Sequence, residues 1–404
     1  MKTTAKSKIF IVLLIFSWIF SSRPGIKQAQ AKISEVGTNT SETGTSLTLS
    51  FSHTLVTGSN RLVVVSIGIE NGDTIDVSTV TYGGKTMTKA IEGLTGTSGF
   101  RYLSEIWYIL ETNLPGNGSQ TVAITCSGTV SEMEINAFCA EYTGVNQGAP
   151  EATDETVYTG SDKTIANTIS PSNNAWVISA VGVGNTDNTF THGQYQNEVL
   201  DFADTSSAFS VAELQGANGE TSLDSTASGT VNRMARVAAS FTQFVPILSI
   251  SVSPSTWTVG TVDEGTVQIS TSGNKIGVTN NGNVVETFTL QIYDEDDRSE
   301  WTHSSLKNGA GNNIYVLSGI FCATTDSPTQ ASFNETDSED VLTTTQQTAT
   351  STKFAYAGGS DNAEAVPVDE QRSLWLRLDM PTAVSGTYAY EQHTVTVRIN
   401  CQQP

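Results

Sequence analysis

Two similar runs of apolar residues organise the chain. The first is Gly58 to Glu70, GSNRLVVVSIGIE, and the second is Pro171 to Asn185, PSNNAWVISAVGVGN. Each begins at a polar Ser-Asn corner and continues through apolar, largely β-branched residues to a glycine and a polar residue, which is typical of a buried strand entered from a turn. Lying about 115 residues apart, they predict one large all-β domain with two related halves, or two central strands of one sandwich.

Shorter apolar or alternating segments predict further strands around these two. They are residues 47–51, 77–90, 101–110, 120–126, 134–142, 208–214 and 233–244. Gly83 and Gly84 allow the positive φ angles that a tight hairpin turn requires. Residues 144–168 and 185–204 show no such pattern, and we expect two long irregular loops there. Loops longer than about 15 residues tend to be functional or disordered, so these two are expected to carry binding contacts.

The N-terminal strand pattern resembles a known type of module. The succession SNRLVVVSIGIE, VSTVTYGGKTMTKA, SEIWYILETNLPGNGSQTVAITCSG and AEYTGVNQGAP resembles a β-sandwich module of large exported bacterial surface proteins, which is similar to lectin-like jelly rolls. The resemblance covers roughly residues 35–244 and implies a fold without a catalytic residue. Two cysteines in this segment depart from the module.

The pattern changes after the Val245-Pro246 step, which breaks the preceding strand. Residues 276–293 alternate around the turn signal Asn280-Asn281-Gly282-Asn283. From residue 250 onward the chain resembles the immunoglobulin-like sandwiches found as accessory domains in exported bacterial proteins. The matching residues are Pro254, Trp257, Gly260, Thr279, Asn280, Gly282 and Asn283. We therefore expect an all-β protein with a jelly-roll-like sandwich at 32–244 and an immunoglobulin-like sandwich at 245–404.

The first 31 residues have the pattern of a secretory signal peptide. Basic residues at Lys2, Lys6 and Lys8 precede an apolar stretch at 9–20, and Ala29-Gln30-Ala31 is a small-x-small cleavage pattern. The apolar stretch is shorter than the roughly 20 residues that span a bilayer. The sequence thus predicts a mature N-terminus at Lys32, no membrane span after cleavage, and a bacterial protein that is secreted, displayed at the cell surface or held in the periplasm.

The chain is strongly acidic. Removing the five basic residues of the leader from a total of 20 leaves 15, against 41 acidic residues. Such a surface repels phosphate backbones, so nucleic acid is not an expected partner. The excess of acid indicates either solubility outside the cell or binding of divalent cations.

Four cysteines suit disulfides in an exported protein. Cys322 ends one apolar run and Cys401 ends the last predicted strand, so we expect these two to be bonded. Cys126 and Cys139 lie in neighbouring predicted strands, and their pairing requires a longer loop or strands in different sheets, so it stays open. The chain contains no Cys-x-x-Cys pattern and no close cluster of cysteine and histidine residues, so we expect no metal site at the cysteines.

Two further groups of residues are candidate ligand sites. Asp294, Asp296 and Asp297 follow a predicted strand and offer carboxylates to Ca²⁺, although their spacing is not that of a 12-residue calcium loop and a solvated loop tip is the simpler interpretation. Trp107, Tyr108 and Trp176 are candidates for an aromatic platform that stacks on a sugar ring. Core packing is the alternative for each, and Trp107 and Tyr108 are adjacent and must point to opposite faces of a strand.

No motif indicates catalysis. The chain has no Gly-x-Ser-x-Gly or His-Glu-x-x-His pattern, and paired carboxylates for glycosidic cleavage cannot be identified from spacing alone. We expect no catalytic residue and no cofactor other than Ca²⁺. The expected function is that of a non-catalytic surface, matrix or assembly protein whose sandwiches contact other surface proteins or glycans, as in adhesion. The alternatives are a carbohydrate-binding protein that uses the N-terminal sandwich and, less favoured, a polysaccharide-active enzyme.

Overall fold

The computed structural model describes residues 9–17, 32–73, 75–95, 100–184, 188–203, 207–217, 219–295, 301–333, 339–357, 361–386 and 392–404. These residues form an all-β, sandwich-type fold, which confirms the predicted fold class. The chain divides into an N-terminal unit, Gln28–Val245, and a C-terminal unit, Pro246–Pro404 together with Met1–Lys27.

The N-terminal unit contains two halves. The strands of the first half are β2 (Ser34–Gly44), β3 (Thr48–Leu55), β4 (Leu62–Asn71), β5 (Ile75–Tyr82), β6 (Lys85–Thr86), β7 (Thr88–Leu94), β8 (Arg101–Leu110), β9 (Gly118–Gly128) and β10 (Glu134–Thr143), with a 3-10 turn at Glu111–Asn113. Those of the second half are β11 (Ala152–Tyr158), β12 (Thr164–Ile169), β13 (Ala175–Val183), β14 (Phe190–His192), β15 (Asn197–Ala203), β16 (Ala208–Ala217), β17 (Thr221–Ala227) and β18 (Met234–Phe241).

The two halves have the same strand order. The inner sheets are β2-β10-β4-β8-β7 and β11-β18-β13-β16-β15, and the outer sheets are β3-β9-β5-β6 and β12-β17-β14. In each half the chain passes between the two sheets in the order of a jelly roll, in which the first and last strands are neighbours. The N-terminal unit is therefore a duplicated sandwich. Of the two arrangements that the sequence left open, the one with two related halves is confirmed.

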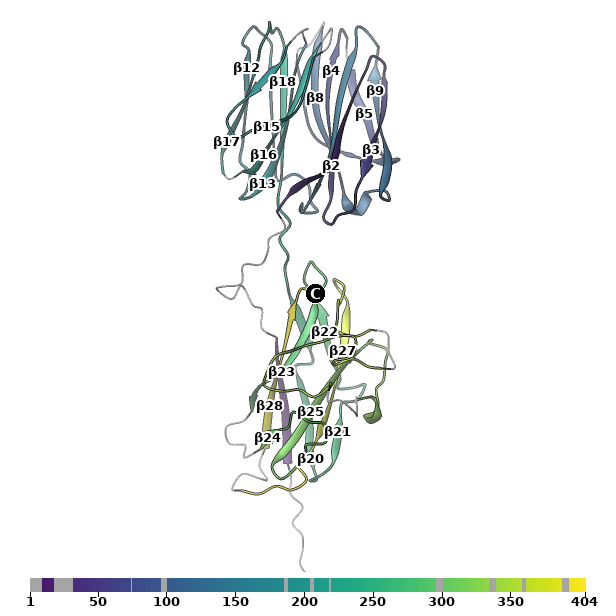
Figure 1. Cartoon of the computed structure of the whole chain (residues 1–404), viewed down its shortest axis with the longest axis vertical. Coiled ribbons are helices and arrows are strands. Elements are labelled where there is room, and N and C mark those ends of the chain that lie inside the picture. The colour runs from purple at the N-terminus through teal and green to yellow at the C-terminus, as the bar shows by residue number, and fades with distance from the viewer. Residues whose placement is uncertain are drawn as a thin grey trace, which may run out of the picture. The chain divides into compact units, whose positions relative to one another are not determined.

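The inner sheets of the two halves pack against each other. One hydrophobic cluster combines Val64, Ile106 and Phe138 of the first half with Ile178, Phe209 and Val237 of the second, and Figure 1 shows the four sheets of the unit as successive layers. Both inner sheets are consequently covered on both faces. This explains why β4 and β13 are apolar without alternation, since every residue in each is buried.

Glycines at equivalent positions allow this close packing. Gly68 on β4 lies against the ring of Phe209 from the second half, and Gly182 on β13 lies against the ring and hydroxyl of Tyr102 from the first. A Cβ atom at either glycine would overlap those rings. The contacts are reciprocal, so the repeated glycine of the two organising runs marks the interface between the halves.

Two local predictions have different outcomes. The Gly83-Gly84 turn is confirmed, because Tyr82 pairs with Lys85 and both glycines have positive φ. The expectation of irregular loops at 144–168 and 185–204 is wrong, since β11, β12, β14 and β15 lie there. These are edge strands or strands of the outer sheet, and most of their exposed positions are polar, so the apolar signal was too weak to identify them.

The C-terminal unit is a second type of sandwich. Its strands are β1 (Ile9–Ser17), β19 (Ile250–Ser253), β20 (Thr256–Val262), β21 (Val267–Ile269), β22 (Ile276–Asn280), β23 (Thr287–Glu295), β24 (Thr302–His303), β25 (Ile314–Cys322), β26 (Gln347–Thr348), β27 (Gln371–Asp379) and β28 (Gln392–Gln402), with a 3-10 turn at Gln330–Ser332. One sheet has the order β20-β1-β28-β23-β26. The other has the order β19-β22-β27-β25-β24, with β21 also paired to β27.

The core of this unit lies between the two sheets. Trp257 is buried there, as the sequence predicts, together with Phe288, Leu317 and Val397. The predicted turn at Asn280–Asn283 carries the chain from β22 in one sheet to β23 in the other. The Asn280 side chain stabilises this turn, because its Nδ2 donates to the carbonyls of Val284 and Val366 and its Oδ1 accepts from the Gly282 amide at 2.8 Å.

The predicted leader is only partly described. Ile9–Ser17, which forms most of its apolar stretch, is strand β1 of the C-terminal unit, and residues 1–8 and 18–31 lie outside the described residues. Within the described part of the chain, no helix has the length and apolar character needed to cross a membrane.

Candidate functional site

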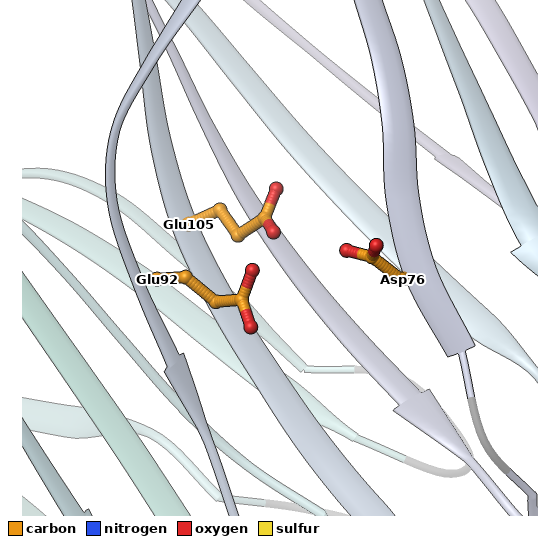
Figure 2. A group of neighbouring side chains, drawn as sticks. All are labelled: Asp76, Glu92 and Glu105. Carbon is orange, nitrogen blue, oxygen red and sulfur yellow. The ribbon is translucent and has the colours of Figure 1, made fainter.

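Three carboxylates come together at one edge of the first half. Asp76 lies on β5 of the outer sheet, whereas Glu92 on β7 and Glu105 on β8 belong to the inner sheet (Figure 2). One oxygen of each lies within 4.8 Å of the others. Glu92 stands directly opposite Glu105 in the β7–β8 pairing, and Glu105 is completely buried. Two carboxylates directly opposite each other destabilise a sheet unless a cation neutralises them.

Lys89 supplies that cation. Its Nζ lies 2.5 Å from Glu92 Oε2, 2.6 Å from Glu105 Oε1 and 3.5 Å from Asp76 Oδ1. The indole Nε1 of Trp107 donates to the second oxygen of Glu105 at 2.5 Å, and the ammonium group lies 5.4 Å from the centroid of the Trp107 ring. The buried carboxylate thus has a donor on each oxygen.

The pKa values of the cluster follow from burial and from Lys89. Burial raises the pKa of Glu105 to about 8, although hydrogen bonds from Lys89 and Trp107 oppose the rise. Burial would raise the pKa of Glu92 as well. The hydrogen bonds that Glu92 makes with Lys89 and Glu105 outweigh this effect, so the pKa of Glu92 is lowered. For Lys89 the loss of water lowers the pKa, and the hydrogen bonds to Glu105 and Glu92 reverse this and raise it.

An all-carboxylate cluster of this kind is suited to hard cations such as Ca²⁺. Here the ammonium group of Lys89 lies among the three carboxylates, where such a cation would be held. The arrangement is therefore an ion-pair network that the chain neutralises with its own cation. The sequence did not reveal it, because Asp76, Glu92 and Glu105 have no characteristic spacing and meet only through strand pairing.

A second polar cluster lies inside the second half, between its two sheets. The guanidinium of Arg236 on β18 is enclosed, and it donates to Ser225 Oγ, to Ser179 Oγ at 3.2 Å and to Gln196 Oε1 at 2.6 Å. His192 Nδ1 lies 2.7 Å from Ser225 Oγ, and its Nε2 lies 2.8 Å from Ser210 Oγ.

The hydroxyl groups determine the tautomer of this histidine. Ser210 Oγ donates to the Leu200 carbonyl at 2.6 Å, so it accepts from the histidine and the ring proton resides on Nε2. The Ser225 hydroxyl then donates to Nδ1. Burial and the charge of Arg236 lower the pKa of His192 to about 4, and burial lowers the pKa of Arg236 to about 9 against the opposing effect of Asp224. His192 is therefore neutral at pH 7.

A Ser-His hydrogen bond is also a feature of nucleophilic catalysis. Ser225 is fully buried, however, and its oxygen already accepts from Arg236. In this arrangement the pair joins the outer sheet to the inner sheet of the second half. The four polar groups replace apolar residues of the first half. The pairings of the inner sheets place Arg236 and Ser179 at the positions of Ala137 and Val65. Aligning the first pairs of the outer sheets, Thr164↔Thr226 with Thr48↔Thr125, places Ser225 and His192 at the positions of Ile124 and Val80.

The predicted aromatic residues are all buried, with exposures of 6% for Trp107, 8% for Tyr108 and 4% for Trp176. Tyr108 packs edge-on against Phe241, and Trp176 packs edge-on against Tyr142. Trp176 also lines a cavity of about 170 Å³ with Lys32, Ile33, Asn174, Gly216 and Gln243. This volume is smaller than the roughly 300–1,000 Å³ of typical small-molecule sites.

Of the three predicted calcium ligands, only Asp294 lies within the described residues. Asp294 is exposed on β23, and Asp296 and Asp297 lie outside the described residues. The adjacent Glu295 accepts a hydrogen bond from the hydroxyl of Tyr315 at 2.5 Å and lies 3.3 Å from His303 Nδ1. Among the described residues, the acidic groups close enough to share a cation are those around Glu105, and Asp294 is not one of them.

The predicted Cys322–Cys401 disulfide is absent, and the Cys126–Cys139 pairing that the sequence left open is not formed either, because all four cysteines are free thiols. Cys322 belongs to a small cluster with Phe333 and Trp375, on the face of β25 that points away from the main core, whereas Cys401 packs against the main core from the other sheet. Cys126 and Cys139 lie in facing sheets of one core, where Cys126 is paired with Val77 on β5 and Cys139 with Val65 on β4. The alternation of side chains along β25 places Cys322 on the face opposite the core that Cys401 contacts.

Comparisons of this chain with protein-family models, with curated proteins and with solved structures find no match.

Proposed function

We propose that this chain is an exported, non-catalytic component of a bacterial surface or extracellular matrix, and that it acts through the outer faces of its sandwiches. The observation that supports this most strongly is the surface formed by β3 and β9, here called the hydroxyl face. Its exposed positions carry short uncharged side chains: Thr48, Ser50, Ser52 and Thr54 on β3, and Ser119, Thr121, Thr125 and Ser127 on β9.

These hydroxyl groups are aligned across the strands. Thr48 is paired with Thr125, Ser52 with Thr121, and Thr54 with Ser119. In a chain with 41 acidic and 20 basic residues, this face carries no charged side chain among its exposed positions. A second acidic surface can approach it without like-charge repulsion, and hydroxyl groups can both donate and accept hydrogen bonds.

The two polar clusters support a role without catalysis. Lys89 occupies the carboxylate cluster, and the His192 and Arg236 cluster is enclosed between sheets. Both clusters join strands of the fold, and in the carboxylate cluster the two exposed carboxylates, Asp76 and Glu92, are paired with Lys89. The interaction surfaces of the sandwiches are what remains to carry the function.

The test combines export with a change to the hydroxyl face. In cells that export the protein, Ser52→Glu together with Thr121→Glu places two acidic side chains on directly opposite positions of this face, where they repel an acidic partner surface. We expect the fraction retained at the surface or in the matrix to fall about tenfold, which corresponds to about 1.4 kcal/mol of binding. Thr352→Glu in an exposed segment of the C-terminal unit is the control and is expected to leave retention unchanged. Wild-type retention by the double variant, or recovery of the wild-type protein from the cytoplasm, would contradict the proposal.

A further inference from the structure

The sheet of the C-terminal unit contains a strand from the far end of the chain. β1 lies between β20 and β28, antiparallel to β20 from Ile9↔Val262 to Leu14↔Thr256 and parallel to β28 from Phe10↔Gln392 to Ser17↔Ile399. Figure 1 shows it as the purple strand beside β28. Among the described residues, β1 is the only strand that pairs with β20.

The remaining strands leave a defined place for β1. The order β19-β22-β27-β25 in one sheet and the neighbours β23 and β28 in the other correspond to strands A-B-E-D and C-F of an immunoglobulin-type sandwich. β1 occupies the position of the seventh strand, G, beside F. Among the described residues, those after Pro246 therefore supply six of these seven strands, and the seventh comes from residues 9–17.

This inference rests on the proposed export of the protein, because the segment that fills the gap is also the apolar part of the predicted leader. Cleavage after Ala31 would remove it. The backbone groups of β20 and β28 that face each other across the gap would then lose their partners. The core would be opened as well, since Trp257 on β20 and Val395 and Val397 on β28 are buried core residues on either side of the gap.

We propose that in the mature protein the gap between β20 and β28, here called the acceptor groove, binds an extended segment of a separate exported polypeptide. This mode of recognition is β-strand addition, in which main-chain hydrogen bonds provide affinity and alternate side chains enter the core. The pairing of β1 defines the ligand as a strand of about eight residues, apolar like IFIVLLIFS, that runs parallel to β28.

The mature chain itself does not offer a suitable strand at its new N-terminus. β2 is the strand that follows Lys32, and it is already paired with β10 from Ser34 to Gly44. Its sequence, SEVGTNTSETG, contains Val36 as its one large aliphatic residue. A second copy would have to break this pairing to insert β2, and it would bring almost no apolar surface. We therefore assign the groove to a different polypeptide.

The binding experiment uses the mature chain, residues 32–404, and a fluorescent peptide that carries residues 9–17 flanked by lysines for solubility. We expect saturable one-to-one binding by fluorescence anisotropy. A control peptide in which every second residue is aspartate should bind at least about tenfold more weakly, and the complete chain 1–404, whose groove is filled, should not bind. If the mature chain alone has lost near-UV circular dichroism from its C-terminal unit, the peptide should restore it. Absence of both binding and restoration would overturn the proposal.

Cross-linking tests the register. A peptide with Leu14→Cys should form a disulfide with mature chain carrying Thr396→Cys, because these positions are paired and Thr396 is only half-buried. The same chain with a Phe10→Cys peptide should react at least about tenfold less. Ser50→Cys on β3, which is an edge strand of another sheet, controls for unselective strand addition. Equal yields at Thr396→Cys and Ser50→Cys would contradict a specific groove.

Two further outcomes separate this proposal from the proposed function. A disulfide between two copies of the Thr396→Cys chain that excludes the peptide would show that a second copy fills the groove, and the assignment to a separate polypeptide would be wrong. Intact mass of the exported protein tests cleavage alone. Retention of residues 1–31 would show β1 to be a permanent strand and would remove the acceptor groove, while the hydroxyl face would remain testable.

Discussion

The two halves of the N-terminal unit have the same strand order and different interiors. Between the sheets of the first half lies one continuous apolar cluster that includes Val65, Val80, Ile124 and Ala137. In the second half the equivalent positions carry polar side chains, and the apolar residues form two smaller clusters on either side of them. The same topology thus tolerates a hydrocarbon core in one copy and a hydrogen-bonded core in the other.

The difference between the two interiors shows which features the fold requires. Both copies keep a positive-φ asparagine before the central strand, at Asn60 and Asn174, and both keep the interface glycine, at Gly68 and Gly182. These positions determine how the chain enters the inner sheet and how closely the halves approach. The sandwich interior is less restricted, provided that every buried polar group has a partner.

The largest effect is expected at Arg236, where the interiors differ most. Arg236→Ala leaves Ser179, Ser225 and Gln196 without the donor that joins them and opens a cavity, and each buried polar group left without its partner costs about 1–3 kcal/mol. Chemical denaturation should show this loss. Ala137→Ser is the matched change in the first half, where a small polar group replaces a small apolar one, and it should cost less.

A complementary test replaces the complete polar network of the second half with the apolar residues of the first half. The combined variant Arg236→Ala, His192→Val, Ser225→Ile and Ser179→Val gives the second half the residues of the first. We expect the stability of this variant to equal or exceed that of wild type, because well-packed apolar residues often replace buried charged groups at no cost. A combined variant as unstable as Arg236→Ala alone would show that the second half requires its polar core.

The next largest effect is expected at Gly182, one of the two glycines at the interface that both halves form. Gly182→Val forces a side chain into the Tyr102 ring, and overpacking of this kind costs about 3 kcal/mol. Gly116→Val is the matched control, since no atom lies within 4 Å of a Cβ at that position. If Gly182→Val unfolds at the same denaturant concentration as wild type, the halves do not pack as described.

Much of this architecture was predictable from the sequence. The buried strands around Val64 and Ile178 were predicted because inner strands covered on both faces are apolar throughout. The polar cluster was not predicted, since Arg236 lies at the centre of a run of small and apolar residues. It meets Ser225 only because the inner sheet packs face to face on the outer sheet. The face of β25 on which the Cys322 side chain lies was not predicted either, because that face depends on which side of β25 meets the other sheet.

The pH dependence of stability is the third test. Burial raises the pKa of Glu213 to about 7, although its hydrogen bond from Tyr142 opposes this, and burial likewise raises the pKa of Glu70 to about 7 against the pull of Arg233. A carboxyl whose folded pKa is raised binds its proton more tightly when folded. Its contribution is complete below the unfolded value of 4.5 and is lost as pH rises through about 7.

We therefore expect the N-terminal unit to be less stable at pH 9 than at pH 5, by on the order of 2–3 kcal/mol for Glu213. Glu213→Gln should flatten this dependence, because the amide does not titrate. Glu155→Gln, which changes an exposed residue of β11, is the control and should leave the pH profile intact. A wild-type profile that rises with pH would contradict the assignment.

A smaller effect concerns the carboxylate cluster of the first half, which has no counterpart among the described residues of the second half. Because Lys89 already neutralises it, neither Ca²⁺ nor a chelator should change the melting temperature of the wild-type protein. Lys89→Ala should unfold more easily and should regain stability in millimolar Ca²⁺, by RT ln(1 + [Ca²⁺]/Kd). Lys85→Ala changes an exposed lysine of β6 and should acquire no such response. Stabilisation of wild type by micromolar Ca²⁺ would identify the cluster as a true metal site.

The smallest expected effect is that of a reducing agent. Two of the four thiols lie in the first half and none in the second, yet both halves are expected to keep their stability in reductant, because none of the cysteines is bonded. A bond between Cys322 and Cys401 would close a loop of nearly 80 residues and contribute about 4 kcal/mol, so its reduction would be obvious in thermal unfolding. Burial raises the pKa of Cys126, Cys322 and Cys401 to about 12, and it raises the pKa of Cys139 as well.

A maleimide should therefore leave the native protein unmodified at pH 7.5 and add four groups after denaturation. Fewer than four adducts without reductant, together with a melting temperature that falls when reductant is added, would restore a disulfide to this fold.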